Sequence, residues 1–104
     1  MDYRQAILIP VYKHGKACER VVENLKPFCE ENQTKVILVD DGNDEDTKNI
    51  LRETAGKNSG FVTLIENERN RGKGVAFRIG MEKAKVLGFT HVLQLDADGQ
   101  HDIG

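Results

Sequence analysis

Apolar residues along the chain gather in two alternating patterns. Short runs rich in apolar residues are typical of strands buried in a sheet, and they occupy residues 6–12, 35–39, 61–65 and 90–95. Between them, apolar residues recur three and four positions apart, the spacing of a helix packed on a sheet, over residues 16–26, 46–56 and 73–87. This alternation predicts an α/β fold with an open, mostly parallel, Rossmann-like sheet and the order βαβαβαβ.

The predicted helices have recognisable ends. Pro27 is expected to end or kink the first helix, because it lacks an N–H and clashes with the preceding turn. Asp44 or Asp46 can cap the start of the second helix. Gly56 and Gly88 suit the ends of the second and third helices.

The chain is short and its charge is balanced. Its 104 residues are enough for a single domain, and the sequence stops soon after the last predicted strand. We therefore expect residues 1–104 to be the truncated N-terminal part of a larger domain. The 15 basic and 17 acidic residues give a net charge of −2, which argues against a nucleic-acid-binding protein. No apolar run is long enough to span a membrane, and we expect no secretory signal.

Cys18 and Cys29 lie in one predicted helical stretch. They are eleven residues apart, roughly three helical turns, which is too far for a disulfide. We expect both to be small, buried or half-buried apolar residues of a protein in the reducing cytoplasm.

Most of the unusual polar residues come where a predicted strand ends. They are Tyr12 after the first strand, Asp40 and Asp41 after the second, Asn70–Lys73 before the third helix, and Asp96, Asp98 and His101 after the fourth strand. The carboxyl ends of parallel strands share one edge of the sheet, where such folds bind ligands. Acidic groups there, with basic groups at a helix start, suit a ligand that carries a divalent metal and phosphates. Asp96-x-Asp98 offers the hard oxygen ligands that Mg²⁺ or Mn²⁺ prefers.

Four segments occur together in the order and at the approximate spacing of family 2 glycosyltransferases. They are Ile7–Tyr12 (ILIPVY), Val39–Gly42 (VDDG), Asn70–Gly80 (NRGKGVAFRIG) and Leu95–Asp102 (LDADGQHD). Over nearly its whole length the chain resembles the nucleotide-sugar-binding half of these GT-A enzymes. The last segment is most similar to the branch of polyprenyl-phosphate sugar transferases, such as dolichol-phosphate mannosyltransferases.

The resemblance implies an activity and a set of partners. It implies inverting transfer of a sugar from a nucleotide-diphospho-sugar, a UDP- or GDP-sugar, with Mg²⁺ or Mn²⁺ as cofactor. For a full-length protein it admits a membrane-associated polyprenyl phosphate as acceptor, at the cytoplasmic face of the membrane. The 104-residue chain is expected to lack the acceptor site and to be inactive alone.

The resemblance also implies contacts to the nucleoside. Pro10 and Tyr12 match positions that line the base pocket, where the tyrosine ring can lie against the base. Asp41, with Asp40 beside it, matches the acidic position that accepts a hydrogen bond from the ring N–H of the base.

The remaining matches concern the diphosphate and the metal. The Asn70–Lys73 loop matches the segment that closes over the nucleotide, with Arg71 or Lys73 near the diphosphate. Asp96 and Asp98 match the Asp-x-Asp motif of the family. In that motif the first carboxylate lies by the ribose and a metal-bound water, and the second binds the metal directly.

Two places depart from the pattern of this branch. Lys13 and His14 stand where the branch often has Asn-Glu, and Ile103 stands where it commonly has proline. In the family the general base comes from a later segment, so we expect it beyond residue 104 and do not assign it to His101 or Asp102. His14 is expected to be an ordinary surface histidine.

Other interpretations stay open at the level of the sequence. Each acidic motif could be a solvated turn, and the cations near the third helix could be loop charges. A nucleotide-binding module without transferase activity, dimerising through an exposed sheet edge, fits the same residues. A sugar-nucleotidyltransferase would have a glycine-rich basic loop where this chain has Val11–Gly15. A phospho-receiver domain would have its acidic pair after the first strand, not the second.

Overall fold

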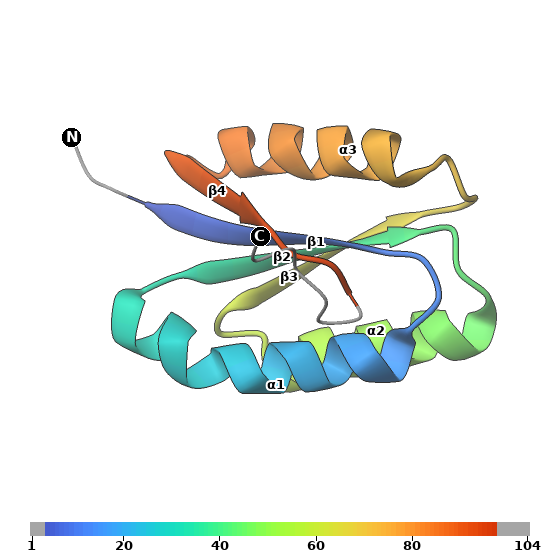
Figure 1. Ribbon diagram of the computed structural model, residues 1–104, viewed down its shortest axis with the longest axis horizontal. Helices are drawn as coiled ribbons and strands as arrows, with labels where there is room; N and C mark the ends of the chain where they lie inside the picture. Colours follow the sequence, from blue (N-terminus) through green and yellow to red (C-terminus); the bar gives the residue numbers. More distant parts are fainter. Residues whose placement is uncertain (1–3, 98–104) are drawn as a thin grey trace, which may run out of the picture.

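The computed structural model describes residues 4–97 of the chain (Figure 1). The strands are β1 (Gln5–Val11), β2 (Lys35–Asp41), β3 (Val62–Asn67) and β4 (His91–Gln94). The helices are α1 (Gly15–Asn32), α2 (Glu45–Lys57) and α3 (Lys73–Val86). All seven predicted elements are present in the predicted order, and the predicted α/β fold is confirmed.

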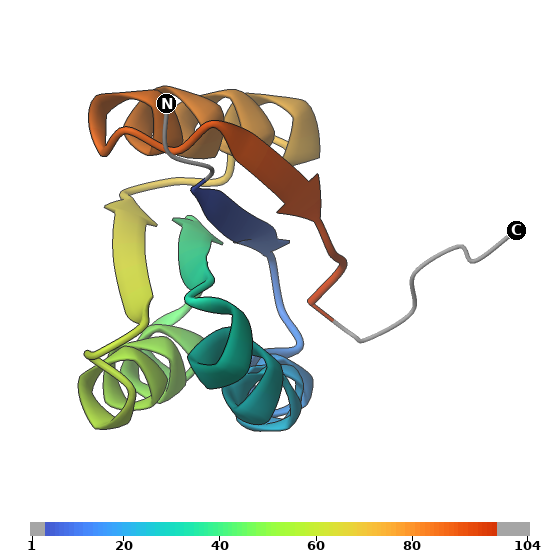
Figure 2. The same ribbon diagram turned by 90° about the vertical axis from the view of Figure 1, so that its left-hand side faces the viewer.

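The strands form one parallel sheet in the order β3-β2-β1-β4. Helices α1 and α2 cover one face and α3 covers the other, so the sheet is the middle of three layers (Figures 1 and 2). The chain runs outward from β1 through β2 to β3, and then returns to place β4 on the opposite flank of β1. The strand order therefore reverses at β1, and ligand crevices of such sheets form outside the strand carboxyl ends at this reversal.

Strands β1 and β2 are buried on both faces, as their apolar sequences require. Ile7 and Ile9 of β1 pack in the cluster under α1 and α2, whereas Leu8 packs in the cluster under α3. Each such large apolar side chain stabilises the fold by roughly 1.5–3 kcal/mol. Strand β4 is an edge strand, and Leu93 on it is 57% exposed. A homodimer through such an edge stays a prediction.

Helix α1 does not end at Pro27 but continues to Asn32, so of the two expected effects of this proline, an end or a kink, the end is wrong. Proline removes one backbone hydrogen bond. However, the turn that follows buries Cys29, which extends the apolar face begun by Cys18. Gln33, in the left-handed conformation, ends the helix and donates its backbone N–H to the Cys29 carbonyl. Packing against the sheet therefore outweighs the local cost of the proline.

The two cysteines are free and buried, as expected. Burial raises the pKa of the Cys18 thiol to about 12, and the nearby Glu19 charge adds to this shift. Burial also raises the pKa of Cys29, partly opposed by the charge of Lys35. Both thiols stay protonated near neutral pH and act as apolar packing groups.

Gly80 lies where α3 packs on β1. A Cβ atom at this residue would lie 2.2 Å from Leu8 Cδ1, and Leu8 is fully buried. We predict that Gly80→Ala lowers the free energy of unfolding by about 1–3 kcal/mol, the usual cost of overpacking, measured by urea denaturation. Gly74→Ala is the matched control, because it lies on the same helix with no atom within 4 Å of the added Cβ. Equal stability of the two variants would contradict the close packing of α3 on Leu8.

Candidate functional site

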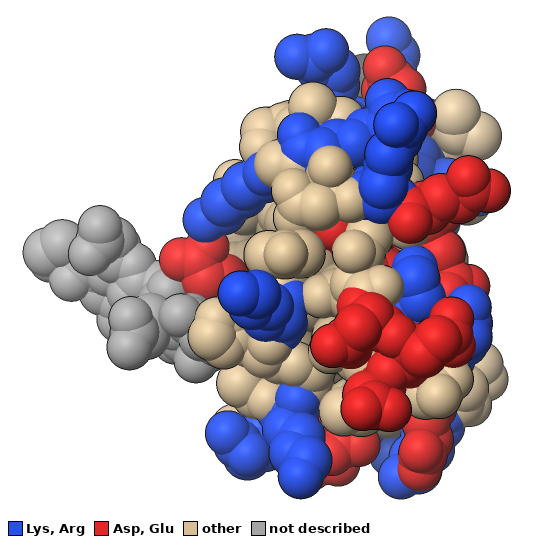
Figure 3. Space-filling view, turned by 90° about the vertical axis from the view of Figure 1, so that its right-hand side faces the viewer, with Lys and Arg blue, Asp and Glu red and all other residues tan. Residues whose placement is uncertain are grey.

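A pocket of about 460 Å³ opens at the carboxyl ends of β1, β2 and β4. Its walls come from these strand ends and from the loop before α3, namely Pro10, Val11, Tyr12, His14, Asp41, Asn70, Gly72, Lys73, Asp96 and Ala97. Figure 3 looks onto this edge, where basic side chains lie at the top, over the α3 layer, and again at the lower left, while acidic side chains gather mainly on the right. The pocket lies at the reversal of the strand order, where the fold predicts a ligand.

A larger hollow, of about 680 Å³, lies at the opposite edge of the sheet. It is lined by the ends of α1 and α2, including Asn32 and Lys57. The C-terminal ends of helices carry partial negative charge, whereas the N-terminal ends at the smaller pocket carry partial positive charge. The larger hollow is, however, also lined by the basic side chains of Arg4, Lys26, Lys35 and Lys57. Charge alone does not decide between the two, and the smaller pocket is preferred because it lies at the reversal of the strand order.

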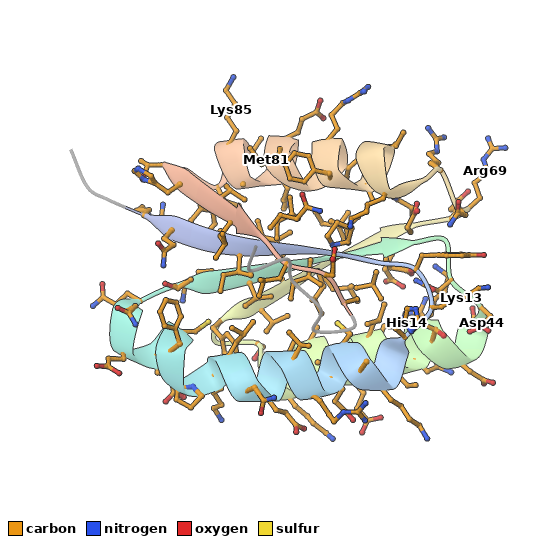
Figure 4. The ribbon with its side chains drawn as sticks, in the orientation of Figure 1. Lys13, His14, Asp44, Arg69, Met81 and Lys85 are labelled. Atoms are coloured by element: carbon orange, nitrogen blue, oxygen red, sulfur yellow. The ribbon has the colours of Figure 1, made fainter. Side chains whose placement is uncertain are left out.

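The turn between β1 and α1 forms one wall of the pocket. Tyr12 is 48% exposed and lines the pocket together with His14. Lys13 and His14 both have left-handed backbone, with φ of 64° and 58°. Lys13 Nζ lies 5.4 Å from the centroid of the Tyr12 ring. In Figure 4 Lys13 and His14 lie at the start of α1, at the same end of the molecule as Arg69. His14 is exposed, as expected of a surface histidine, and it also lines the pocket.

Asp41 ties the end of β2 to the loop before α3. It is 2% exposed and lines the pocket. Its Oδ1 accepts a hydrogen bond from the Arg71 backbone N–H at 2.9 Å, and its Oδ2 accepts one from the Gly72 N–H at 3.1 Å. The carboxylate therefore holds the loop in place and keeps further lone pairs for a ligand.

Asp40 does not line the pocket, although the sequence grouped it with Asp41 as a ligand contact. It is fully buried, and both of its oxygens have partners in the protein. Oδ1 accepts from the backbone and side-chain N–H groups of Asn43 at 3.0 and 2.6 Å, and Oδ2 accepts from Lys48 Nζ at 2.5 Å. Successive side chains of a strand point to opposite faces, which separates these neighbouring acids.

Lys73 and Asp96 meet across the mouth of the pocket. Lys73 is the first residue of α3, and its Nζ lies 2.5 Å from Asp96 Oδ1. Both side chains are substantially exposed, so the pair contributes little stability and can exchange partners easily. The Arg71 side chain is not part of the pocket wall, and only its backbone contributes, through Asp41.

Of the two predicted metal ligands, only Asp96 belongs to the described residues; Asp98 lies outside them, as do His101 and Asp102. Within residues 4–97, no group of three or more His, Cys, Asp or Glu side chains could hold a metal ion. Mg²⁺ and Mn²⁺ bound with substrate phosphates need only one or two carboxylates. Asp96 is a partly exposed carboxylate in the pocket wall and is paired with the Lys73 ammonium. The described residues therefore fit an Mg²⁺ or Mn²⁺ ion that is bound mainly by phosphates.

Comparison with known proteins identifies the class. The profile of the family described as Glycosyl transferase family 2 matches residues 6–104, and the chain belongs to this family. The family expected from the four sequence segments is therefore confirmed. A mannosyltransferase from Pyrobaculum calidifontis, PcManGT, solved in complex with GDP-Man and Mn²⁺, shares the fold with a TM-score of 0.76 and 22% identity. The match covers 94% of this chain and 28% of that structure, and it confirms the predicted Rossmann-like fold of GT-A type.

Curated relatives include transferases that use polyprenyl phosphates. The chain is 34% identical to UDP-N-acetylglucosamine–dolichyl-phosphate N-acetylglucosaminyltransferase of Methanococcus voltae, over 91% of this chain and 41% of that protein. It is 33% identical to undecaprenyl-phosphate 4-deoxy-4-formamido-L-arabinose transferase of Pseudomonas syringae pv. syringae, over 92% of this chain and 28% of that protein. The chain thus spans less than half the length of these relatives.

Gly42 is the residue on which the loop before α3 closes. Its φ is +70°, and a Cβ there would lie 2.0 Å from the backbone of Arg69 and Asn70. We predict that Gly42→Ala displaces this loop, breaks the Asp41 hydrogen bonds and costs about 1–3 kcal/mol of stability, measured by chemical denaturation together with amide exchange at Arg71 and Gly72. Gly56→Ala, with no atom within 4 Å of its added Cβ, is the control. Unchanged protection of these two amides in Gly42→Ala would contradict the docked loop.

Proposed function

We propose that this chain is the donor-binding part of a glycosyltransferase that takes a nucleotide-diphospho-sugar with Mg²⁺ or Mn²⁺. The observation that carries the proposal is the pocket at the strand reversal, which brings together an aromatic ring, a buried carboxylate and an ion pair. Tyr12, Asp41, Lys73 and Asp96 supply these groups from four separate parts of the chain.

The nucleoside end of the donor is assigned to the wall made by β1 and β2. The Tyr12 ring is exposed enough to lie against a base, and Pro10 gives that wall an apolar surface. Asp41 can accept a hydrogen bond from the ring N–H of the base while it keeps its bonds to the loop. Uracil and guanine both carry such an N–H, so UDP- and GDP-sugars both fit this assignment.

The diphosphate is assigned to the start of α3. Backbone N–H groups of the first helical turn and the Lys73 ammonium favour an anion there. Lys73 would leave Asp96 for the phosphates, and Asp96, with Asp98 as the predicted second ligand, would hold the divalent ion. When bound, that ion supplies stabilisation of the negative charge that grows on the leaving diphosphate.

The transfer step itself is assigned to the whole enzyme. An acceptor oxygen attacks the anomeric carbon opposite the diphosphate, the bond to the diphosphate breaks, and the configuration inverts. The names of the two relatives above support a polyprenyl phosphate as acceptor. No helix within residues 4–97 is long and apolar enough to cross a membrane.

Nucleotide binding without transfer is the second candidate for the chain taken alone. The argument in its favour is that every pocket residue discussed above is assigned to the donor and none to an acceptor. The two candidates share the donor site and differ in turnover, which a transfer assay with a polyprenyl phosphate separates from a binding assay.

We predict metal-dependent binding of UDP or GDP to the chain, measured by isothermal titration with and without Mn²⁺. Asp96→Asn should weaken metal-dependent binding about tenfold or more, because a contact to a charged group contributes about 1.5–3 kcal/mol. Glu53→Gln is the control, since it removes an exposed carboxylate of α2 that does not line the pocket. A folded chain that binds neither nucleotide would contradict the proposal for these residues.

A further inference from the structure

The turn that carries Tyr12 and His14 has a backbone that its residues do not favour. Lys13 and His14 are consecutive, both are left-handed, and both have a Cβ atom. L-residues adopt this conformation at a cost, and usually one residue at a time. His14 precedes α1 without making a side-chain capping bond. The turn therefore depends on contacts from elsewhere in the chain.

Asn43 makes those contacts. Its Oδ1 accepts the Lys13 backbone N–H at 2.5 Å, and its Nδ2 donates to the Val11 carbonyl at 2.8 Å. One buried amide side chain thus bonds the backbone on both sides of Tyr12. This bridge needs an acceptor and a donor on the same side chain, which an amide provides and a carboxylate does not.

Asn43 is itself held by a buried ion pair. Asp40 Oδ1 accepts from both nitrogens of Asn43, and Asp40 Oδ2 accepts from Lys48 Nζ. Lys48 also donates to the Asn67 carbonyl at 3.1 Å, at the end of β3. Asp40 is fully buried and the Lys48 side chain is 13% exposed. The network joins the carboxyl ends of β1, β2 and β3 to α2.

We propose that Asn43 is a positioning residue of the donor pocket. The Asp40–Lys48 pair holds Asn43, and Asn43 fixes the left-handed turn. This turn determines the positions of the Tyr12 and His14 side chains relative to the nucleotide. Asp40 then acts on the ligand through Asn43 and the turn, without touching the ligand. The inference rests on the proposed function for the identity of the ligand, and on the hydrogen bonds above for the turn.

The test combines a loss with a rescue. Asn43→Ala removes the bridge and should weaken binding of UDP or GDP with Mn²⁺ about tenfold, which corresponds to about 1.4 kcal/mol. Glycine adopts left-handed backbone without steric cost. In a Lys13→Gly background, Asn43→Ala should therefore weaken binding no more than about threefold. Asp44→Ala is the matched control, because it removes the N-cap bond to Thr47 one residue away and destabilises α2 without touching the turn.

Amide exchange in the nucleotide-free chain provides a second readout. In Asn43→Ala the Lys13 amide should lose at least tenfold in protection, and the NMR signals of Tyr12 and His14 should shift, whereas Asp44→Ala should leave all three unchanged. A protected Lys13 amide in Asn43→Ala would overturn the proposal, as would unchanged affinity or a loss that the glycine background does not reduce. If the unaltered chain binds no nucleotide, the proposed function fails, and the exchange data alone decide the role of Asn43.

Discussion

Strand β1 is the element on which the rest of the structure depends. It is buried on both faces, it pairs in parallel with β2 on one side and β4 on the other, and it is where the strand order reverses. Because all four strands run the same way, every strand ends on one edge of the sheet and every helix begins there. Residues up to 87 positions apart in sequence, from Pro10 to Ala97, therefore meet around one pocket whose helix N-terminal ends favour an anion.

The two acids at the end of β2, Asp40 and Asp41, have different structural roles. Asp41 turns to the pocket and holds the loop before α3, whereas Asp40 turns to the interior and holds Asn43. The Asp40 carboxylate can be buried this deeply because the Lys48 ammonium balances its negative charge. The two N–H groups of Asn43 donate hydrogen bonds to the other oxygen of Asp40. The pocket is thus shaped by a polar network beneath it as well as by the residues that line it.

The sequence predicted the order of the elements because the buried strands are apolar along their whole length and the helices carry a clear stripe. It placed Tyr12, Asp41, Lys73 and Asp96 at one edge because the strand ends of a parallel sheet converge, and these residues line one pocket there. Pro10, which lines the same pocket, was expected only from the resemblance to the family. The path of α1 beyond Pro27 was not predictable, since it depends on tertiary packing of Cys29. Strand β2 runs through Asp40 and Asp41 instead of ending at residue 39, so strand alternation turns these neighbouring acids to opposite faces. His14 lies in a turn that is bonded to Asn43, a contact between segments distant in sequence.

The most direct test of the account is a crystal structure of the chain with Mn²⁺ and whichever of UDP and GDP binds more tightly. We expect the base to lie against the Tyr12 ring and to donate a hydrogen bond to Asp41, and we expect the diphosphate to bind at the start of α3 beside Lys73. A nucleotide seated in the hollow at the ends of α1 and α2, or a base that touches neither Tyr12 nor Asp41, would contradict it.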